Sequence, residues 1–227
     1  MAHWTLDDIP WERFEPQKLD PELLRIVKAA SLVEQNGADY ARYLCGVFAD
    51  DAAFQDAVRR WGEEEIQHGI ALGRYAHLAD PTFDHAAACA RFTAGFRVDL
   101  DATASVRGSR ASELVARCIV ETGTSSYYIA LSEATDEPVL KAICQRIAAD
   151  ELRHYKLFLT PAPRGFLKRR IIGEDAAEIA RVIGAILLDE ARGFDEAQQF
   201  GIELLPLEMR PRNIVERPMR HGWSVAS

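Results

Sequence analysis

Residues 61–78 read WGEEEIQHGIALGRYAHL, and residues 147–159 read IAADELRHYKLFL. Each stretch contains the pattern Glu-x-x-His, formed by Glu65 and His68 in the first and by Glu151 and His154 in the second. Both stretches lie within segments that we predict to be helical. Because residues three apart lie on one face of a helix, the two side chains of each pair can reach the same metal ion.

Two further glutamates extend this repeat. Glu34 lies 31 residues before Glu65, and Glu121 lies 30 residues before Glu151. The two Glu-x-x-His patterns are 86 residues apart, and the two upstream glutamates are 87 residues apart. The sequence therefore predicts two copies of one unit, in which a helix with Glu is followed by a turn and a helix with Glu-x-x-His. Two antiparallel pairs related by a pseudo-two-fold axis bring all six side chains to one level.

The remaining sequence also predicts helices. Asp20 is a good N-cap and Pro21 a good first residue for a helix that runs to about residue 48, with Gly37 as its only weak point. Further helices are expected at about 51–77, 109–134, 139–159 and 174–200, and a short one within the long connection 81–108. No segment shows sustained strand alternation. This pattern predicts an all-α, ferritin-like four-helix bundle with a long crossover between its second and third helices, plus an additional C-terminal helix.

Composition sets the class of protein. The chain has 227 residues and is 48% hydrophobic, which suits one domain. We divide it into an N-terminal arm (1–20), a four-helix di-metal bundle (21–160), and an extra helix with an irregular tail (161–227). A net charge of −8 argues against nucleic acid or an anionic membrane as the main partner. We expect no signal peptide and no membrane span, and therefore a cytoplasmic protein. The four cysteines form no CxxC pair, which excludes a rubredoxin-type or zinc-ribbon site.

The residue types point to a centre of two metal ions. Carboxylates are hard anionic ligands that can bridge two ions, and imidazole suits iron and manganese. Four carboxylates offset the four positive charges of two divalent ions. A Glu from each of two helices with a Glu-x-x-His from each of the other two is the arrangement of ferritin-like di-iron and di-manganese proteins. We predict two iron ions, with manganese or a mixed pair as alternatives, and the ligands Glu34, Glu65, His68, Glu121, Glu151 and His154.

An acid precedes each Glu-x-x-His pattern. Metal-bound imidazoles usually donate their free N–H to an acceptor. We predict that Asp150 orients His68 and that Glu64 orients His154, each across the bundle. The alternative for Glu64 is a merely exposed side chain.

Other residues near the predicted ligands have two interpretations each. Thr124 and Ser125 lie one turn past Glu121, and Tyr128 lies two turns past it. They are candidate catalytic residues that relay protons or hydrogen-bond a ligand. Alternatively, the two hydroxyls bond backbone carbonyls of their own helix and Tyr128 belongs to the core. Small residues near the ligands either leave room for a substrate or allow close helix packing, and these are Ala30, Gly37, Ala38 and Ser125. Trp61 is interpreted as packing, and His3, His77, His85 and His221 as surface or cap residues.

The sequence resembles the ferritin-like di-iron carboxylate superfamily, and within it the soluble acyl-ACP desaturases. WGEEEIQHG and ADELRHYKLF are similar to the EE-x-x-H and DE-x-x-H motifs of those enzymes, and ETGT at residues 121–124 is similar to their third-helix motif. The resemblance covers about residues 25–160. It implies that the six residues above are iron ligands, that Asp150 supports His68, and that Thr124 lies on the oxygen side.

Three functions follow from these observations. The first is an oxidoreductase that activates dioxygen and desaturates, hydroxylates or oxygenates a small organic substrate, with electrons from a separate donor protein. The second is a ferroxidase, an iron-handling protein or a peroxide-detoxifying protein, the last with manganese as an alternative metal. The third is a binding protein without oxygen chemistry. The predicted fifth helix either covers the bundle or forms the interface of a homodimer.

Overall fold

The computed structural model describes residues 3–96 and 98–159, and every regular element in these ranges is helical. The all-α prediction is confirmed for this part of the chain. Three 3₁₀ turns come first, at Leu6–Asp8 (η1), Trp11–Arg13 (η2) and Pro16–Lys18 (η3). Six α-helices follow, at Pro21–Gln35 (α1), Gly37–Val47 (α2), Ala52–Ala79 (α3), His85–Gly95 (α4), Arg110–Ala134 (α5) and Pro138–Leu159 (α6).

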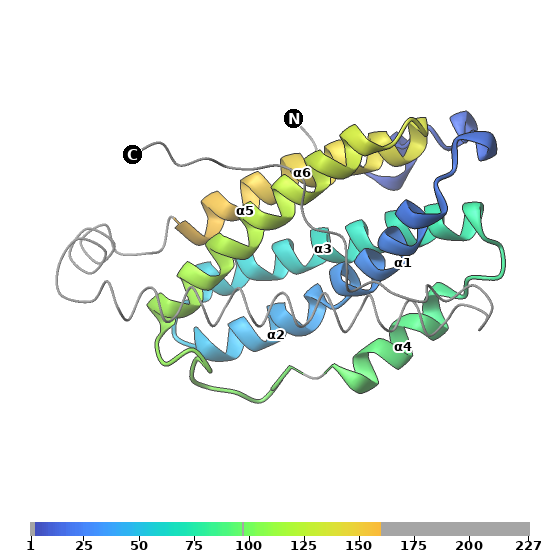
Figure 1. Ribbon diagram of the computed structural model, residues 1–227. Coiled ribbons are helices and arrows are strands. Elements are labelled where there is room, and N and C mark those ends of the chain that lie inside the picture. The colour runs from blue at the N-terminus through green and yellow to red at the C-terminus, as the bar shows by residue number, and fades with distance from the viewer. Residues whose placement is uncertain (1–2, 97, 160–227) are drawn as a thin grey trace, which may run out of the picture.

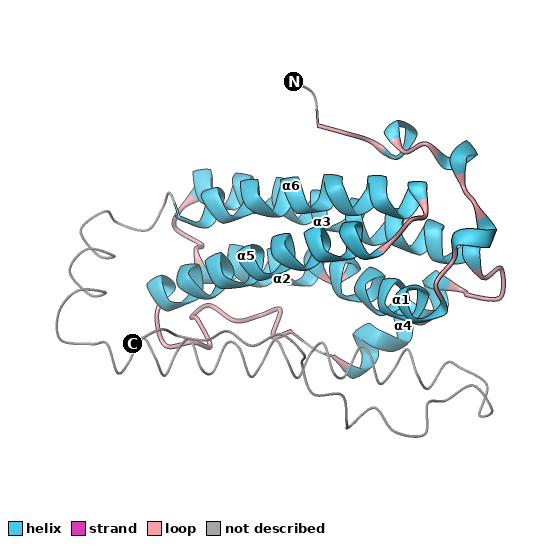
Figure 2. Cartoon of the chain, turned by 45° about the horizontal axis from the view of Figure 1, so that its top comes forward, coloured by secondary structure: helices cyan, strands magenta, loops and turns pink. Residues whose placement is uncertain are grey.

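The long helices pack in two groups (Figure 1). Helices α1 and α2 follow one another along α3, and α5 packs along α6. The two groups meet through α3 and α6, while α4 lies against α1 on the outside (Figure 2). The predicted long connection therefore carries a helix, α4, on its way between the groups.

Side-chain caps fix where the helices begin. Asp20 accepts hydrogen bonds from the backbone N–H groups of Glu22 and Leu23, and Pro21 occupies the first turn of α1, as the sequence predicts. Asp51, Asp84 and Ser109 cap α3, α4 and α5 in the same way. These caps satisfy N–H groups that have no partner inside the helix.

The predicted single helix over residues 21–48 is wrong in one respect, because the chain breaks at Asn36 into α1 and α2. A Cβ atom on Gly37 would lie 2.3 Å from the Cβ atom of Glu65 on α3. Only glycine permits this contact, and glycine also weakens a helix interior. Close packing at this point therefore coincides with the break.

The N-terminal arm packs over the core. Ile9 is buried, and Trp4, Trp11 and Phe14 pack against the apolar cluster that α1, α3, α4, α5 and α6 enclose. The indole N–H of Trp11 donates to the carbonyl oxygen of Leu6 at 2.7 Å, which closes the arm on itself. The arm is a chain of short 3₁₀ turns and not an extended segment.

The predicted fifth helix at 174–200 and the irregular tail lie outside the described residues. Among the helices that the structure describes, none has the length and apolar character needed to cross a membrane.

Candidate metal centre

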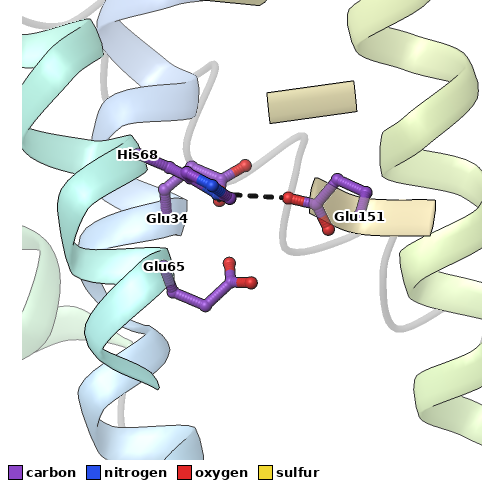
Figure 3. Close-up of side chains that lie close together, drawn as sticks. All are labelled: Glu34, Glu65, His68 and Glu151. Atoms are coloured by element: carbon purple, nitrogen blue, oxygen red, sulfur yellow. Dashed lines mark ion pairs between the residues drawn. The ribbon is translucent and has the colours of Figure 1, made fainter. Parts of the chain in front are cut away.

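The six predicted ligands lie together in the middle of the fold, although they come from four helices. Glu34 is at the end of α1, Glu65 and His68 are in the middle of α3, Glu121 is in α5, and Glu151 and His154 are in α6. All six side chains are buried, and none is more than 7% exposed. Figure 3 shows the carboxylates of Glu34, Glu65 and Glu151 turned toward a common space beside His68.

His68 faces one half of this cluster. Its Nδ1 atom lies 3.5 Å from Oε2 of Glu34 and 3.3 Å from Oε1 of Glu151. Its other ring nitrogen, Nε2, hydrogen-bonds Oδ2 of Asp150 at 3.0 Å. The imidazole is thus held from outside and presents Nδ1 to the cluster.

His154 has the same arrangement in the other half. Its Nδ1 atom lies 2.9 Å from Oε1 of Glu65, 3.4 Å from Oε2 of Glu121 and 3.6 Å from Oε2 of Glu151. Its Nε2 atom hydrogen-bonds Oε2 of Glu64 at 2.8 Å. Each histidine thus has inner carboxylates near Nδ1 and a further carboxylate on Nε2.

The cluster forms two overlapping groups of four ligand atoms. Glu34, Glu65, His68 and Glu151 make one group, and Glu65, Glu121, Glu151 and His154 make the other, with the atoms of each group within 4.8 Å of one another. Glu65 and Glu151 belong to both groups. Since a carboxylate can bridge two ions through its two oxygens, this arrangement suits a pair of ions with two shared ligands and two terminal ligands each.

Five buried atoms of these side chains make no hydrogen bond, although Nδ1 of His154 and Oε1 of Glu65 lie 2.9 Å apart. They are Nδ1 of His68 and of His154, Oε1 of Glu65, Oε2 of Glu121 and Oε1 of Glu151. Buried polar atoms are nearly always satisfied, because an unsatisfied one reduces stability. All five belong to the cluster, and all are types of atom that bind iron or manganese. The donor set therefore fits two such ions.

Asp150 and Glu64, which we call the outer carboxylates, are in the predicted contacts with His68 and His154. Arg153 lies 2.5 Å from Oδ1 of Asp150 and 3.1 Å from Oε2 of Glu64, so one guanidinium links both. Glu64 is half-buried, and the alternative of a merely exposed side chain is wrong. Neighbouring charges lower the pKa of both outer carboxylates despite partial burial.

The N-terminal arm contributes contacts that the sequence did not predict. The indole N–H of Trp4 donates to Oδ2 of Asp150 at 2.6 Å, and its ring stacks on that of His68 with centroids 5.9 Å apart. Nε2 of His3 lies 2.8 Å from the same Asp150 oxygen. The interpretation of His3 as a surface or cap residue was wrong in this respect. No motif links positions 3 and 4 to position 150, so local patterns give no signal for this contact.

Ionisation within the cluster is strongly coupled. Burial and the charge of Glu151 raise the pKa of Glu121 to about 8, and burial with Glu151 and Glu34 raises that of Glu65. Burial disfavours the imidazolium of His68, but the carboxylates of Asp150, Glu151 and Glu34 outweigh burial and raise its pKa. Without metal, the cluster therefore holds protons that bound cations displace.

The three predicted hydroxyl groups differ in their surroundings. Thr124 donates toward Oε2 of Glu151 at 3.0 Å, and its oxygen is also 3.1 Å from the carbonyl oxygen of Val120. Tyr128 is buried and donates a hydrogen bond to Oε1 of Glu34. Ser125 donates to the carbonyl oxygen of Ala148 on α6 at 2.9 Å, which is neither a predicted ligand nor a carbonyl of its own helix. Thr124 and Tyr128 thus contact predicted ligands, whereas Ser125 joins α5 to α6.

A cavity of about 410 Å³ adjoins the cluster. The carboxylate-bearing residues Glu34, Glu65, Glu121 and Glu151 form part of its wall, and the rest is mainly apolar and aromatic, with residues from α1 to α5. Of the four small residues named above, Ala30 and Gly37 line it. Val33 and Gly123, also in its wall, are exposed, so the cavity reaches the protein surface between α1 and α5.

No protein-family model matches this chain, and comparisons with curated proteins and with solved structures found no significant match either.

Proposed function

We propose that this protein is a non-haem di-iron carboxylate oxidoreductase that activates dioxygen to oxidise a small organic substrate. In this proposal α1 with α2, α3, α5 and α6 form a ferritin-like four-helix bundle, related to that of the soluble acyl-ACP desaturases. One observation carries the proposal: both histidines are fixed through Nε2 by an outer carboxylate and present an unsatisfied Nδ1 to four buried carboxylates.

Each residue of the cluster has a distinct role in this proposal. Glu34 and His68 would hold one ion, Glu121 and His154 would hold the other, and Glu65 and Glu151 would serve both. When bound, iron supplies the redox chemistry with dioxygen, while manganese or a mixed pair remains the alternative metal content. The protein fixes the geometry through Asp150 and Glu64, and it buries the ligand side chains. The hydroxyl of Thr124 is placed to hold a proton beside Glu151.

The cavity favours an organic substrate over iron handling alone. A ferroxidase needs a path for ferrous ions, which a mainly apolar and aromatic wall does not favour. Pockets of this size and character bind small organic molecules. Electrons for such a reaction come from a separate donor protein, because the sequence contains no flavin or iron–sulfur motif.

Metal content tests the first part of the proposal. Full-length protein loaded anaerobically with ferrous iron and then desalted should retain two ions per chain, measured by elemental analysis. Glu65→Ala and Glu151→Ala should each lose both ions, because these carboxylates are shared. Glu63→Ala, an exposed neighbour on α3, is the matched control and should retain two. Retention of two ions by both cluster variants would contradict the proposed ligand set.

Reactivity tests the second part. The iron-loaded protein with a chemical reductant should consume dioxygen faster in the presence of a suitable organic substrate. Rapid turnover of ferrous iron or peroxide with no response to any organic compound would favour the ferroxidase or peroxide-detoxifying alternative.

A further inference from the structure

A tyrosine hydroxyl distinguishes one half of the metal centre from the other. Tyr128 is 1% exposed, and its hydroxyl donates to Oε1 of Glu34. The other oxygen of this carboxylate, Oε2, faces Nδ1 of His68 at 3.5 Å (Figure 3). The carboxylate is therefore fixed by α5 through one oxygen and turned toward the other ligand atoms with the second. A carboxylate held in this way loses little conformational freedom when a metal ion binds.

The sequence repeat gives Glu121, the corresponding glutamate of the other half, no equivalent of this hydrogen bond. The two upstream glutamates are 87 residues apart, and the residue 87 positions before Tyr128 is Ala41. Alanine has no side-chain donor. In agreement, Oε2 of Glu121 makes no hydrogen bond. The two glutamates that are not shared between the metal positions are thus held differently.

The same offset also relates two residues beside the shared carboxylates. Thr124 lies 87 positions after Gly37. Thr124 donates toward Oε2 of Glu151, and a Cβ atom on Gly37 would lie 2.3 Å from the Cβ atom of Glu65. Each of the two residues therefore lies against a shared carboxylate, so the offset pairs positions with similar places in the two halves.

The histidine on the Glu34 side also has the more deeply buried support. Nε2 of His68 bonds Oδ2 of Asp150, and the same oxygen accepts the indole N–H of Trp4. Only 5% of the Asp150 side chain is exposed. The carboxylate that bonds Nε2 of His154 belongs to Glu64, whose side chain is 22% exposed. A buried acceptor with several partners restricts a ligand more than one that is partly in water.

We propose that the two metal positions are unequal, and that the position at Glu34 and His68 fills first. The position at Glu121 and His154 then takes the second ion with lower affinity. Glu65 and Glu151 would serve both positions, so the difference comes from the ligands that are not shared and from the residues that hold them. The inference rests on the proposed function, since it takes the centre of two ions as its premise. Unequal positions also allow a mixed pair to form when two metals are supplied in order.

Manganese titration of two single-histidine variants tests the order of binding. His154→Ala keeps the position at Glu34 and His68 intact, and His68→Ala keeps the other position intact. The electron paramagnetic resonance signal of free Mn²⁺ measures the affinity of the remaining position in each full-length variant. His154→Ala should bind its ion about tenfold or more tightly than His68→Ala. Each variant holds one ion, so repulsion between two bound ions, which weakens the second even at identical positions, does not enter.

Tyr128→Phe tests whether the hydroxyl causes the difference. Combined with His154→Ala, it should lower manganese affinity about tenfold, because Glu34 loses the partner that fixes it. Combined with His68→Ala, it should leave the affinity unchanged, because the remaining position does not use Glu34. An equal loss in both combinations would indicate general loosening of the centre and overturn the role of Tyr128. If Tyr128→Phe does not fold, the two histidine variants still decide the order.

Tyr43→Phe is the matched control. It removes a buried hydroxyl that donates to Oε2 of Glu113 at 2.8 Å, and Glu113 belongs to neither group of candidate ligands. This variant should be less stable than the wild type but should bind manganese with unchanged affinity. A loss of affinity equal to that of Tyr128→Phe would overturn the inference, because loss of any buried hydrogen bond would then weaken the centre.

The wild type, titrated in parallel, separates this inference from the proposed function. Equal affinities of His154→Ala and His68→Ala, or tighter binding by His68→Ala, would overturn the inference. If the wild type still bound two ions in that case, the proposed function would stand. A wild type that binds fewer than two ions would contradict the proposed function, and this inference with it.

Discussion

Each histidine of the centre acts through both of its ring nitrogens. Nε2 bonds an outer carboxylate, and Nδ1 faces the inner carboxylates. An imidazole held in this way has little freedom to rotate, so the position of Nδ1 is set before a metal ion arrives. The outer carboxylates also favour the tautomer that carries its proton on Nε2, which leaves the Nδ1 lone pair for a metal.

The outer carboxylates, Asp150 and Glu64, provide a prediction about single residues. Asp150→Asn and Glu64→Gln should each lower metal affinity by about 10–100-fold, because each removes the negative charge beside a histidine ligand and replaces one of two acceptor oxygens by a donor. Competition with a coloured chelator measures the affinity. Glu63→Gln changes the same charge at an exposed site on α3 and should alter affinity little. An equal loss in all three variants would mean that overall charge, and not histidine orientation, controls binding.

The sequence predicts the ligand cluster better than its surroundings. Equal spacing in two halves is enough to bring Glu34, Glu65, Glu121 and Glu151 together, because helix geometry converts sequence spacing into position. The contact between Trp4 and Asp150 depends on the path of the arm over the helices, which no local pattern specifies.

At the scale of helices, Gly37 controls how closely α2 approaches α3. Gly37→Ala would place a Cβ atom 2.3 Å from Cβ of Glu65, so one of the helices must shift. We expect a loss of about 1–3 kcal/mol in the free energy of unfolding, together with weaker metal binding because a shared ligand is displaced. Urea denaturation and chelator competition measure the two effects.

Gly123→Ala is the matched control for this change. Gly123 also lies within a helix and near the cluster, but a Cβ atom there would contact nothing within 4 Å. The substitution should increase stability by up to about 1 kcal/mol through helix propensity alone. If the two variants were equally stable, close packing at Gly37 would not be the cause of the loss.

The N-terminal arm is the second element with a testable role. Trp4→Phe keeps an aromatic ring against His68 but removes the N–H that donates to Asp150. We expect metal affinity to fall severalfold, less than for Asp150→Asn, because the carboxylate keeps its other partners. Trp11→Phe removes an N–H that donates only within the arm, to the carbonyl oxygen of Leu6. It should leave the affinity unchanged, and an equal effect of both variants would indicate general loosening of the arm.

For the described part of the molecule as a whole, the buried cluster opposes folding unless cations are bound. Four carboxylates and two imidazoles occupy space that apolar side chains would otherwise fill. Burying charges without compensation is unfavourable, and the raised pKa values of Glu65 and Glu121 reflect this. A ligand that binds only the folded state stabilises it, so metal loading should raise the melting temperature.

The raised pKa of Glu121 makes the stability of the metal-free protein depend on pH. Because burial and the charge of Glu151 raise that pKa to about 8, the folded metal-free protein holds a proton here that the unfolded chain releases above about pH 4.5. The folded state then binds more protons than the unfolded state between these values, so stability falls as pH rises from about 4.5 to 8. Glu121→Gln should reduce this fall by about 1–3 kcal/mol in metal-free protein.

Metal loading should reverse which of the wild type and Glu121→Gln is the more stable. Metal-free Glu121→Gln should be more stable than the wild type at pH 8, where ionised Glu121 is unfavourable. After ferrous or manganous loading under nitrogen, the wild type should be the more stable, because only it keeps the full ligand set. Thermal unfolding at pH 6 and pH 8, with and without metal, measures both differences. Glu133→Gln, an exposed substitution on the same helix, should follow the wild type throughout. If metal stabilised Glu121→Gln as much as the wild type, Glu121 would not be a ligand.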